Sequence, residues 1–349
     1  MRKLFVIASL VSIVLSSLSF SKESLRSIYS RPSSEWPKPS VDEGVYWKEL
    51  GILPSSPLDL QNDSIKNLVE LGKILFFDTR LSNSGKISCA TCHQPELSWT
   101  DGKEKSIGHE GAMNKRNSPS LQNVWFFQKL FWDGRAKDLQ DQAFAPINSE
   151  SEMHSDMPDV MRKIRSVKEY SNLFKKAFGD DAIDPDRMTE AIASFEKTIV
   201  SRKSRFDDFL EGNKKALTNS ELRGLNLFRT KARCMNCHNG SLFSDNQFHN
   251  TGLTHGDDGY YKVTHKDEDK GKFKTPSLRD VVKTGPWMHD GSFTDLSQVI
   301  SRYNIAKAPP GSSDLIRSIG LTNKEMKDLL AFLKAISAEP LVFGKPSIP

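Results

Sequence analysis

Two segments of the chain share one pattern of apolar and polar positions, and each predicts an amphipathic helix. The first is VELGKILFFDTRLS and the second is ELRGLNLFRTKAR, and apolar residues recur in both at helical spacing. In each segment a glycine (Gly72, Gly224) is followed four residues later by a phenylalanine (Phe76, Phe228). This internal repeat predicts two similar domains in tandem.

Capping signals and a further apolar stripe predict the rest of a helical frame. Thr218-x-x-Glu221 and Thr322-x-x-Glu325 both fit the capping box that begins a helix. Residues 189–210 predict one long helix, and strand signals are few and short. A last helix, at about 323–336, should pack against the helix that starts the second domain, and its apolar stripe is Met326, Leu329, Leu330, Leu333 and Ile336. The predicted fold class is therefore mainly α, with long loops.

The N-terminus resembles a secretory signal peptide over residues 1–21. A short basic start precedes an apolar and serine-rich run of 17 residues, and small residues permit cleavage after Ser21. A run of this length is near the lower limit for a membrane span, so an uncleaved anchor is the alternative. Residues 22–57 are rich in Ser and Pro and predict an extended arm. We expect its large aromatic side chains to lie on the body of the protein: Trp36, Tyr46 and Trp47.

Length and charge limit the interpretation further. The 349 residues suit two modest domains, which we place at 58–204 and 205–349. The leader holds two of the 49 basic residues and none of the 44 acidic ones, so the mature chain has a net charge of about +3. A charge of this size does not indicate a nucleic-acid partner.

The four cysteines form two matching motifs: Cys89-Ala-Thr-Cys92-His93 and Cys234-Met-Asn-Cys237-His238. Cys-x-x-Cys-His is typical of covalent c-type haem attachment, in which the thiols bind the haem vinyl groups and the histidine binds the iron. A zinc site with four cysteine ligands would use both pairs but gives no reason for the two histidines. A thioredoxin-like site needs a βαβ context that is missing. The sequence therefore predicts two c-type haems, and export fits, because such haem is attached outside the bacterial cytoplasm.

The task of each haem depends on the sixth position of its iron, since an open position permits peroxide binding and a strong ligand gives an electron relay. His109, near two glycines, could bind an iron reversibly, and His289 lies in an apolar stretch suited to a haem pocket. Trp132 could carry electrons between the irons or be an ordinary core aromatic. Cleavage of the O–O bond also needs an acid–base group. The residues alone leave three candidates open: Glu150, Glu152 and Asp156.

Eight short motifs follow one another in a recognisable order: GKILFFDTRLS, SCATCH, RNSPSLQNV, FWDGRAKDLQDQAFAPI, EM, CMNCH, KTPSLRDV and GPWMHDGSF. In this order they resemble the bacterial di-haem cytochrome c peroxidase family, which includes MauG. The resemblance covers about 58–338. It implies two tandem cytochrome c-like domains, each around one covalently attached haem, in a periplasmic homodimer.

The resemblance also implies roles for single residues. Peroxide would react at the N-terminal haem of His93, and electrons would enter at the C-terminal haem of His238. His109 matches the histidine that caps the peroxidatic iron until reduction releases it, and Glu152 matches the acid–base glutamate. The remaining matches are Gln142 and Pro146 in the same pocket, Trp132 between the haems, and a calcium site at Asn117, Thr284 and Pro286.

The chain departs from the peroxidase pattern at one position. Peroxidases of the family place a methionine ligand on the electron-transfer haem, but the matching stretch LSQVISRYNIAKAPPG contains none. It offers Tyr303 instead, as in MauG-like members, and the later Met326 is the alternative. A phenolate is a hard anionic donor and should lower the haem potential, whereas methionine raises it.

Three functions follow from these features. The first is a periplasmic peroxidase that reduces hydrogen peroxide to water with electrons from a small donor protein such as cytochrome c or a cupredoxin. The second, favoured by Tyr303, is a MauG-like enzyme that uses peroxide to oxidise tyrosine or tryptophan residues of a partner protein. The third is a non-catalytic di-haem electron carrier, which the combination of FWDGRA with Glu152 disfavours.

Overall fold

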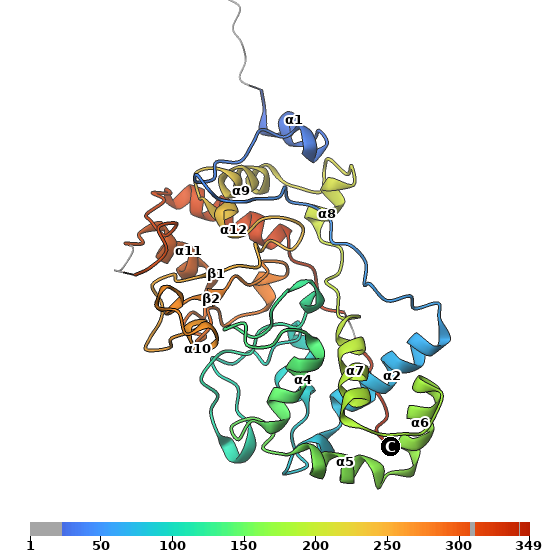
Figure 1. The fold of residues 1–349 in the computed structure, drawn as a ribbon. Coiled ribbons are helices and arrows are strands. Elements are labelled where there is room, and N and C mark those ends of the chain that lie inside the picture. The colour runs from blue at the N-terminus through green and yellow to red at the C-terminus, as the bar shows by residue number, and fades with distance from the viewer. Residues whose placement is uncertain (1–22, 308–310, 342) are drawn as a thin grey trace, which may run out of the picture.

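The structure is a computed structural model that describes residues 23–307, 311–341 and 343–349 (Figure 1). The expected signal peptide, residues 1–21, lies outside the described residues. Two short strands, β1 (Phe248–His249) and β2 (Phe273–Lys274), pair antiparallel. The helices are α1 (Leu25–Tyr29), α2 (Asp63–Phe77), α3 (Cys89–Cys92), α4 (Leu139–Asn148), α5 (Met157–Arg165), α6 (Lys168–Phe178), α7 (Pro185–Glu196), α8 (Arg205–Leu210), α9 (Asn219–Arg229), α10 (Tyr261–Thr264), α11 (Leu296–Asn304) and α12 (Asn323–Ala335). The mainly α fold class predicted from the sequence is confirmed.

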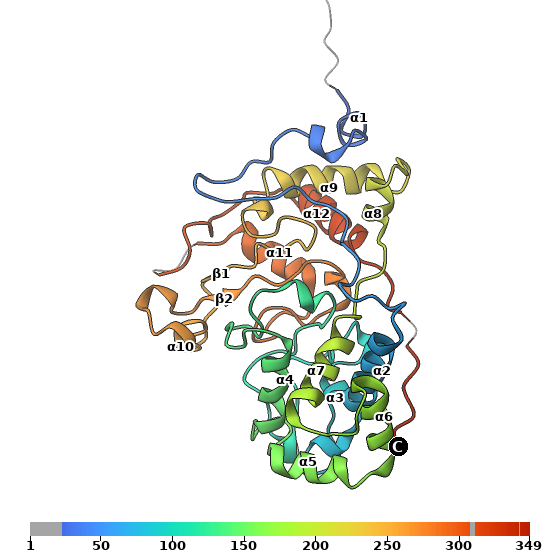
Figure 2. The same cartoon turned by 45° about the vertical axis from the view of Figure 1, so that its right-hand side comes forward.

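The helices gather into two halves that stay separate in both views (Figures 1 and 2). In one half α2, α4, α5, α6 and α7 lie together, and in the other α8 and α9 lie beside α11 and α12. Each half has its own buried aromatic core. The first core includes Phe76, Tyr170, Phe174 and Phe195, and the second includes Phe206, Phe228, Phe243 and Phe332.

The two repeated glycines lie where helices cross most closely. Gly72 of α2 faces α7, and a Cβ at this position would lie 1.8 Å from the Ala191 carbonyl oxygen. Gly224 of α9 faces α12, and a Cβ there would lie 2.0 Å from the Asp328 carbonyl oxygen. The repeat seen in the sequence is therefore a repeated helix crossing. The predicted packing of the last helix against the start of the second half is confirmed.

Both capping boxes predicted from the sequence are also confirmed. The Thr218 side chain accepts from the Glu221 backbone N–H at the start of α9, and Thr322 and Glu325 do the same for α12. The single helix predicted over 189–210 is wrong, because α7 ends at Glu196 and α8 begins at Arg205. The intervening Thr-Ile-Val run is β-branched, and Ser204 caps a new helix with Asp207, so the chain restarts rather than continues.

The N-terminal arm lies on the body of the protein, where it runs over the second half. Trp36 is buried in the second core and Trp47 packs against it. Tyr46, however, is 78% exposed, so the expectation that all three aromatics lie on the body is wrong for this residue. At the other end, the C-terminal tail returns to the first half (Figure 1), where the Phe343 ring stacks on Phe77 at 5.7 Å between centroids. Among the described residues, no helix has both the length and the apolar content needed to cross a membrane.

The close crossings generate a stability prediction. Gly72→Ala and Gly224→Ala should each lower the free energy of unfolding by about 1–3 kcal/mol, because overpacking outweighs the better helix propensity of alanine. Urea unfolding of the haem-loaded protein, followed by circular dichroism, measures this. Gly51→Ala is the control, since its added Cβ would meet only ordinary contacts at 3.9 Å or beyond. Equal midpoints for all three variants and the wild type would contradict the close-packing argument.

Candidate active site

The first Cys-x-x-Cys-His motif forms the single turn α3, with Ser88 and Thr91 as a reciprocal cap. His93 follows directly, and its Nδ1–H donates to the Trp99 carbonyl at 3.0 Å. Burial lowers the pKa of His93, so the imidazole is neutral. Because Nδ1 carries the proton, Nε2 is left with its lone pair for an iron.

The second motif repeats this arrangement at the 3-10 turn Cys234–Asn236. The His238 Nδ1–H donates to the Phe243 carbonyl, also at 3.0 Å. Burial again lowers the pKa of this histidine. Both imidazoles are therefore neutral, oriented and free at Nε2, which is the state that an iron ligand needs.

One cavity of about 350 Å³ reaches both histidines, a size within the usual range of cofactor pockets. Its lining includes Cys234, Cys237 and the apolar side chains Phe131, Trp132 and Leu296. All four cysteines are free thiols, with no disulfide to prevent thioether formation. Two pairs of free thiols, each followed by an oriented histidine, fit two covalently attached haems, although Cys89 and Cys92 are not among the residues that line this cavity.

Glu152 and His109 lie on two loops that pack against each other. The His109 backbone N–H donates to the Glu152 carbonyl at 2.8 Å. Gly108 permits this approach, because a Cβ at that position would lie 2.1 Å from the Ser151 carbonyl oxygen. The structure therefore brings together two residues that are 43 positions apart in the chain.

The environment of Glu152 favours its protonated form. Burial raises the pKa of Glu152, although the guanidinium of Arg135 acts in the opposite direction. Burial also raises the pKa of the Cys92 thiol to about 11, and the charges of Asp101 and Glu152 add to this effect. Glu152 is thus close enough to the first cysteine pair for their charges to interact.

The His109 ring is stacked rather than free. It lies parallel to the His154 ring, with 4.5 Å between centroids and 17° between planes. Among the described residues, its buried Nδ1 has no hydrogen-bond partner. His109 does not line the cavity that His93 and Gln142 share. In this structure the His109 imidazole therefore packs against the His154 ring and not into the cavity.

Helix α4 carries Gln142 and Pro146 towards the same region. Gln142 lines the cavity. Pro146 lies inside the helix, and its carbonyl accepts from the Met153 backbone N–H at 3.1 Å, which ties the loop of Glu152 to α4.

Trp132 lies at the junction of the two halves. It lines the cavity, and its indole N–H donates to the Asn117 carbonyl at 2.9 Å. Its ring meets the His289 ring edge to face at 6.5 Å. His289 stacks in turn on Phe273 at 3.6 Å, and burial lowers the His289 pKa to about 4, so this ring is neutral.

Tyr303 of α11 lines the cavity together with Cys234, Cys237 and His238. Burial raises the pKa of Tyr303 to about 12, and the thiols of Cys237 and Cys234 act in the same direction. Met326, the alternative ligand, is not among the cavity-lining residues and packs against the second core.

The three calcium-site candidates lie around the same junction. Asn117, Thr284 and Pro286 all line the cavity. The Asn117 amide donates to the carbonyls of Lys103 and Glu104 at 2.9 and 3.3 Å, which fixes its orientation.

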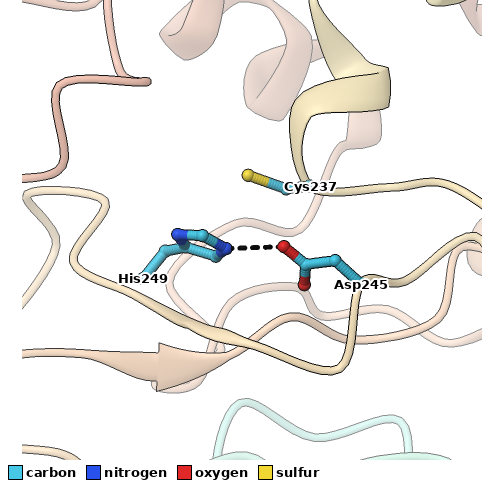
Figure 3. A group of neighbouring side chains, drawn as sticks. All are labelled: Cys237, Asp245 and His249. Atoms are coloured by element: carbon cyan, nitrogen blue, oxygen red, sulfur yellow. Dashed lines mark hydrogen bonds and ion pairs between the residues drawn. The ribbon is translucent and has the colours of Figure 1, made fainter. Parts of the chain in front are cut away.

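A group of three possible metal ligands lies next to the second motif (Figure 3): Cys237, Asp245 and His249. The Nε2 of His249 and a carboxylate oxygen of Asp245 are 2.7 Å apart. Burial alone would lower the pKa of His249, but its hydrogen bonds to Asp245 and Cys237 raise it to about 10. Because the Cys237 sulfur is needed for a haem thioether, this group is better described as an imidazolium–carboxylate pair beside the haem site.

Two ionisable residues near the site, Glu196 in the core and the half-buried Lys274, were missed by the sequence analysis. Glu196 of α7 has a carboxylate oxygen without a hydrogen-bond partner among the described residues, and burial raises its pKa to about 8. Lys274 of β2 lines the cavity, and burial lowers its pKa to about 7. Lys274 is the first residue of the KTPSLRDV motif, although the sequence analysis gave it no role.

Comparison with known proteins identifies the family of the chain. The family model described as di-haem cytochrome c peroxidase matches residues 66–215. The methylamine utilization protein MauG of Methylophilus methylotrophus is 38% identical over 303 residues, which cover 84% of this chain and 90% of that protein. The cytochrome c551 peroxidase of Nitrosomonas europaea is 36% identical over 320 residues, which cover 89% and 93%.

Solved structures agree with the fold. A MauG-like protein associated with microbial copper homeostasis has a TM-score of 0.74 at 32% identity, and the match covers 84% of this chain and 96% of that one. The di-haem peroxidase BthA from Burkholderia thailandensis has a TM-score of 0.69 at 24% identity, covering 90% and 98%, and supports the fold alone.

The family predicted from the sequence motifs is confirmed by these matches, and with it an oxidoreductase of the peroxidase type that carries two haems. This also removes the non-catalytic carrier from consideration. The chain belongs to the di-haem cytochrome c peroxidase family, which includes MauG.

Proposed function

We propose that the protein reduces hydrogen peroxide to water at the haem of Cys89, Cys92 and His93, with electrons that a small redox protein delivers to the haem of Cys234, Cys237 and His238. The observation that carries this proposal is one cavity that reaches both preoriented histidines and has Trp132 in its wall. We assign the N-terminal haem domain to 58–204 and the C-terminal haem domain to 205–349.

The bound haems supply the redox chemistry, and the protein supplies the proton transfer. Glu152 takes a proton from one peroxide oxygen and delivers it to the other, which leaves as water. Its raised pKa supports this role, because the carboxylate is basic enough to accept the proton. Gln142, at the cavity wall, positions the peroxide.

Electrons cross the junction of the halves through aromatic rings. Trp132 and His289 are in edge-to-face contact, and each belongs to a different half. His109 would act as a reversible sixth ligand of the first iron, for which it must leave the ring of His154.

Tyr303 is proposed as the sixth ligand of the second iron. Helices α4 and α11 both begin after an Asp-Leu boundary, at Asp138-Leu139 and Asp295-Leu296. Pro146 and Tyr303 are each the eighth residue of their helix. Proline has no group that can bind iron, whereas a tyrosine hydroxyl can, so of these two equivalent positions only Tyr303 would supply a ligand to an iron.

We also propose a calcium ion between the halves, with Asn117, Thr284 and Pro286 as its ligands. This proposal is supported by the fact that all three residues line the same cavity. Oxygen ligands of this kind suit a hard cation.

We further propose a periplasmic homodimer, with the leader-like residues 1–21 directing export.

The second candidate function is a MauG-like oxidation of tyrosine or tryptophan residues in a partner protein, and Tyr303 favours it. A phenolate ligand disfavours reduction of the second iron and makes it a poorer acceptor from an ordinary cytochrome c.

Steady-state kinetics separate the two functions. With reduced cytochrome c or a cupredoxin as donor, a peroxidase turns over peroxide continuously, and the donor is oxidised at two electrons per peroxide. A MauG-like enzyme gives little such turnover and instead produces radicals on tyrosine or tryptophan of a partner, detected by EPR. Continuous donor oxidation without partner radicals is the expected result.

Glu152→Gln should slow peroxide turnover by about 10²-fold or more, because the amide cannot shuttle a proton. Both haems should remain bound, as judged by the pyridine haemochrome spectrum. Glu150→Gln is the matched control, since Glu150 is an exposed acid two residues away. Equal rates for the two variants would remove Glu152 from the mechanism.

Tyr303→Phe should change the absorption and EPR spectra of the second haem and leave those of the first unaltered. The phenyl ring keeps the packing of α11 but has no oxygen to bind iron. Tyr46→Phe, at a residue that is 78% exposed, controls for the loss of a hydroxyl. If the Tyr303→Phe spectra match those of the wild type, another ligand is present, and Met326 is the next to test.

A further inference from the structure

The two halves share a longer repeat than the helix-and-motif pair seen in the sequence. Residues 117–139 align with 274–296 at a constant offset and without a gap. Pro-Ser-Leu stands at 119–121 and 276–278, and Asp-Gly stands at 133–134 and 290–291. In each half the repeated segment follows the haem motif and contributes residues to the cavity wall.

The backbone follows the same path in both copies. Asn123 and Asp280 are both left-handed, with φ of 60° and 58°. Phe131 and Met288 are left-handed too, with φ of 64° and 73°. Because non-glycine residues seldom adopt this conformation, its recurrence at matched positions shows that the copies are equivalent in structure.

The two copies also face each other across an approximate two-fold axis. The Asn117 backbone N–H donates to the His289 carbonyl at 2.8 Å, and the Lys274 backbone N–H donates to the Trp132 carbonyl at 2.8 Å. Asn117 is equivalent to Lys274, and Trp132 is equivalent to His289. The two hydrogen bonds are therefore equivalent: in each, the first position of one copy donates to the carbonyl of the matching position in the other copy.

Because the halves are equivalent, the proposed calcium site in one half has a counterpart at the matching positions of the other half. Asn117 corresponds to Lys274, and Thr284 corresponds to Phe127. At this counterpart site, the Lys274 ammonium lies over the Phe127 ring, 3.7 Å from its centroid. Where one half has oxygen donors suited to a cation, the other half has a cation of its own on an aromatic ring.

The Lys274 ammonium has no anionic partner among the described residues, although it lines the cavity. Lys274 is half-buried, and a cation that is partly removed from water is costly unless a counter-charge accompanies it. The bound haem brings such a charge, since its propionate groups are carboxylates.

We propose that Lys274 is the built-in cation of the second half, which binds a haem carboxylate at the position equivalent to the calcium ligand Asn117. Lys274 is a positioning residue: it fixes the haem and raises its reduction potential, because a nearby positive charge favours the reduced state. This inference rests on the proposed binding of two haems in this cavity.

The test is a spectroelectrochemical titration of the haem-loaded protein. In Lys274→Met, the reduction equilibrium of one haem should fall about tenfold, which is a drop of about 59 mV for one electron. Lys274→Arg keeps the charge and should retain most of the wild-type potential. Lys272→Met is the matched control, because it removes a charge two residues away that is already paired with Asp269 at 3.0 Å.

The outcomes separate this inference from the proposed function. Two bound haems with both potentials unchanged in Lys274→Met would overturn the role of Lys274 and leave the peroxidase proposal intact. An equal drop in Lys272→Met would also overturn it, since the effect would then be one of net charge. Fewer than two haems in the wild-type protein would instead contradict the proposed function itself.

Discussion

The structure depends on one hydrogen bond that is made twice, from a half-buried imidazole Nδ1–H to a backbone carbonyl. His93 donates to Trp99 and His238 to Phe243, each at 3.0 Å. The accepting residues are both left-handed, with φ of 62° and 55°, so each turn is bent back towards its histidine at some conformational cost. The hydrogen bond offsets this conformational cost, because without it the imidazole would lose its orientation and its polar N–H would be left unsatisfied.

The helical frame fixes where these histidines lie. The glycine crossings bring α2 against α7 and α9 against α12 at backbone contact, which leaves little freedom for the turn that follows each first helix. Each Cys-x-x-Cys-His motif therefore starts from a rigid base. Trp132 and Glu152 lie on long loops that are tied to the rest of the protein by backbone hydrogen bonds, whereas Lys274, like Trp132 a lining residue of the cavity, lies on the short strand β2.

Much of this arrangement could be predicted from the sequence, because its signals are local. Capping boxes, apolar spacing and the cysteine motifs each act over a few residues, and they identified α9, α12 and both histidines. The break between α7 and α8 was missed, since apolar periodicity continues through the β-branched residues that interrupt the helix. The stacking of His109 on His154 and the packing of Lys274 on Phe127 depend on contacts between distant segments, which no local pattern records.

The approximate two-fold symmetry explains how one duplicated frame can divide two tasks. Equivalent positions differ in the groups they present: Pro146 against Tyr303, and Trp132 against His289. In the proposed function the first pair distinguishes the two irons, because a tyrosine can bind iron and a proline cannot. The second pair places an oxidisable indole on one side of the junction and a neutral imidazole on the other. Because the reciprocal bonds at Asn117 and Lys274 join the two copies directly, the halves cannot shift independently without breaking them. The two halves thus share one backbone arrangement but carry different side chains at the positions that matter for the chemistry. The hydrogen bonds between the two copies keep the two sites at a fixed distance.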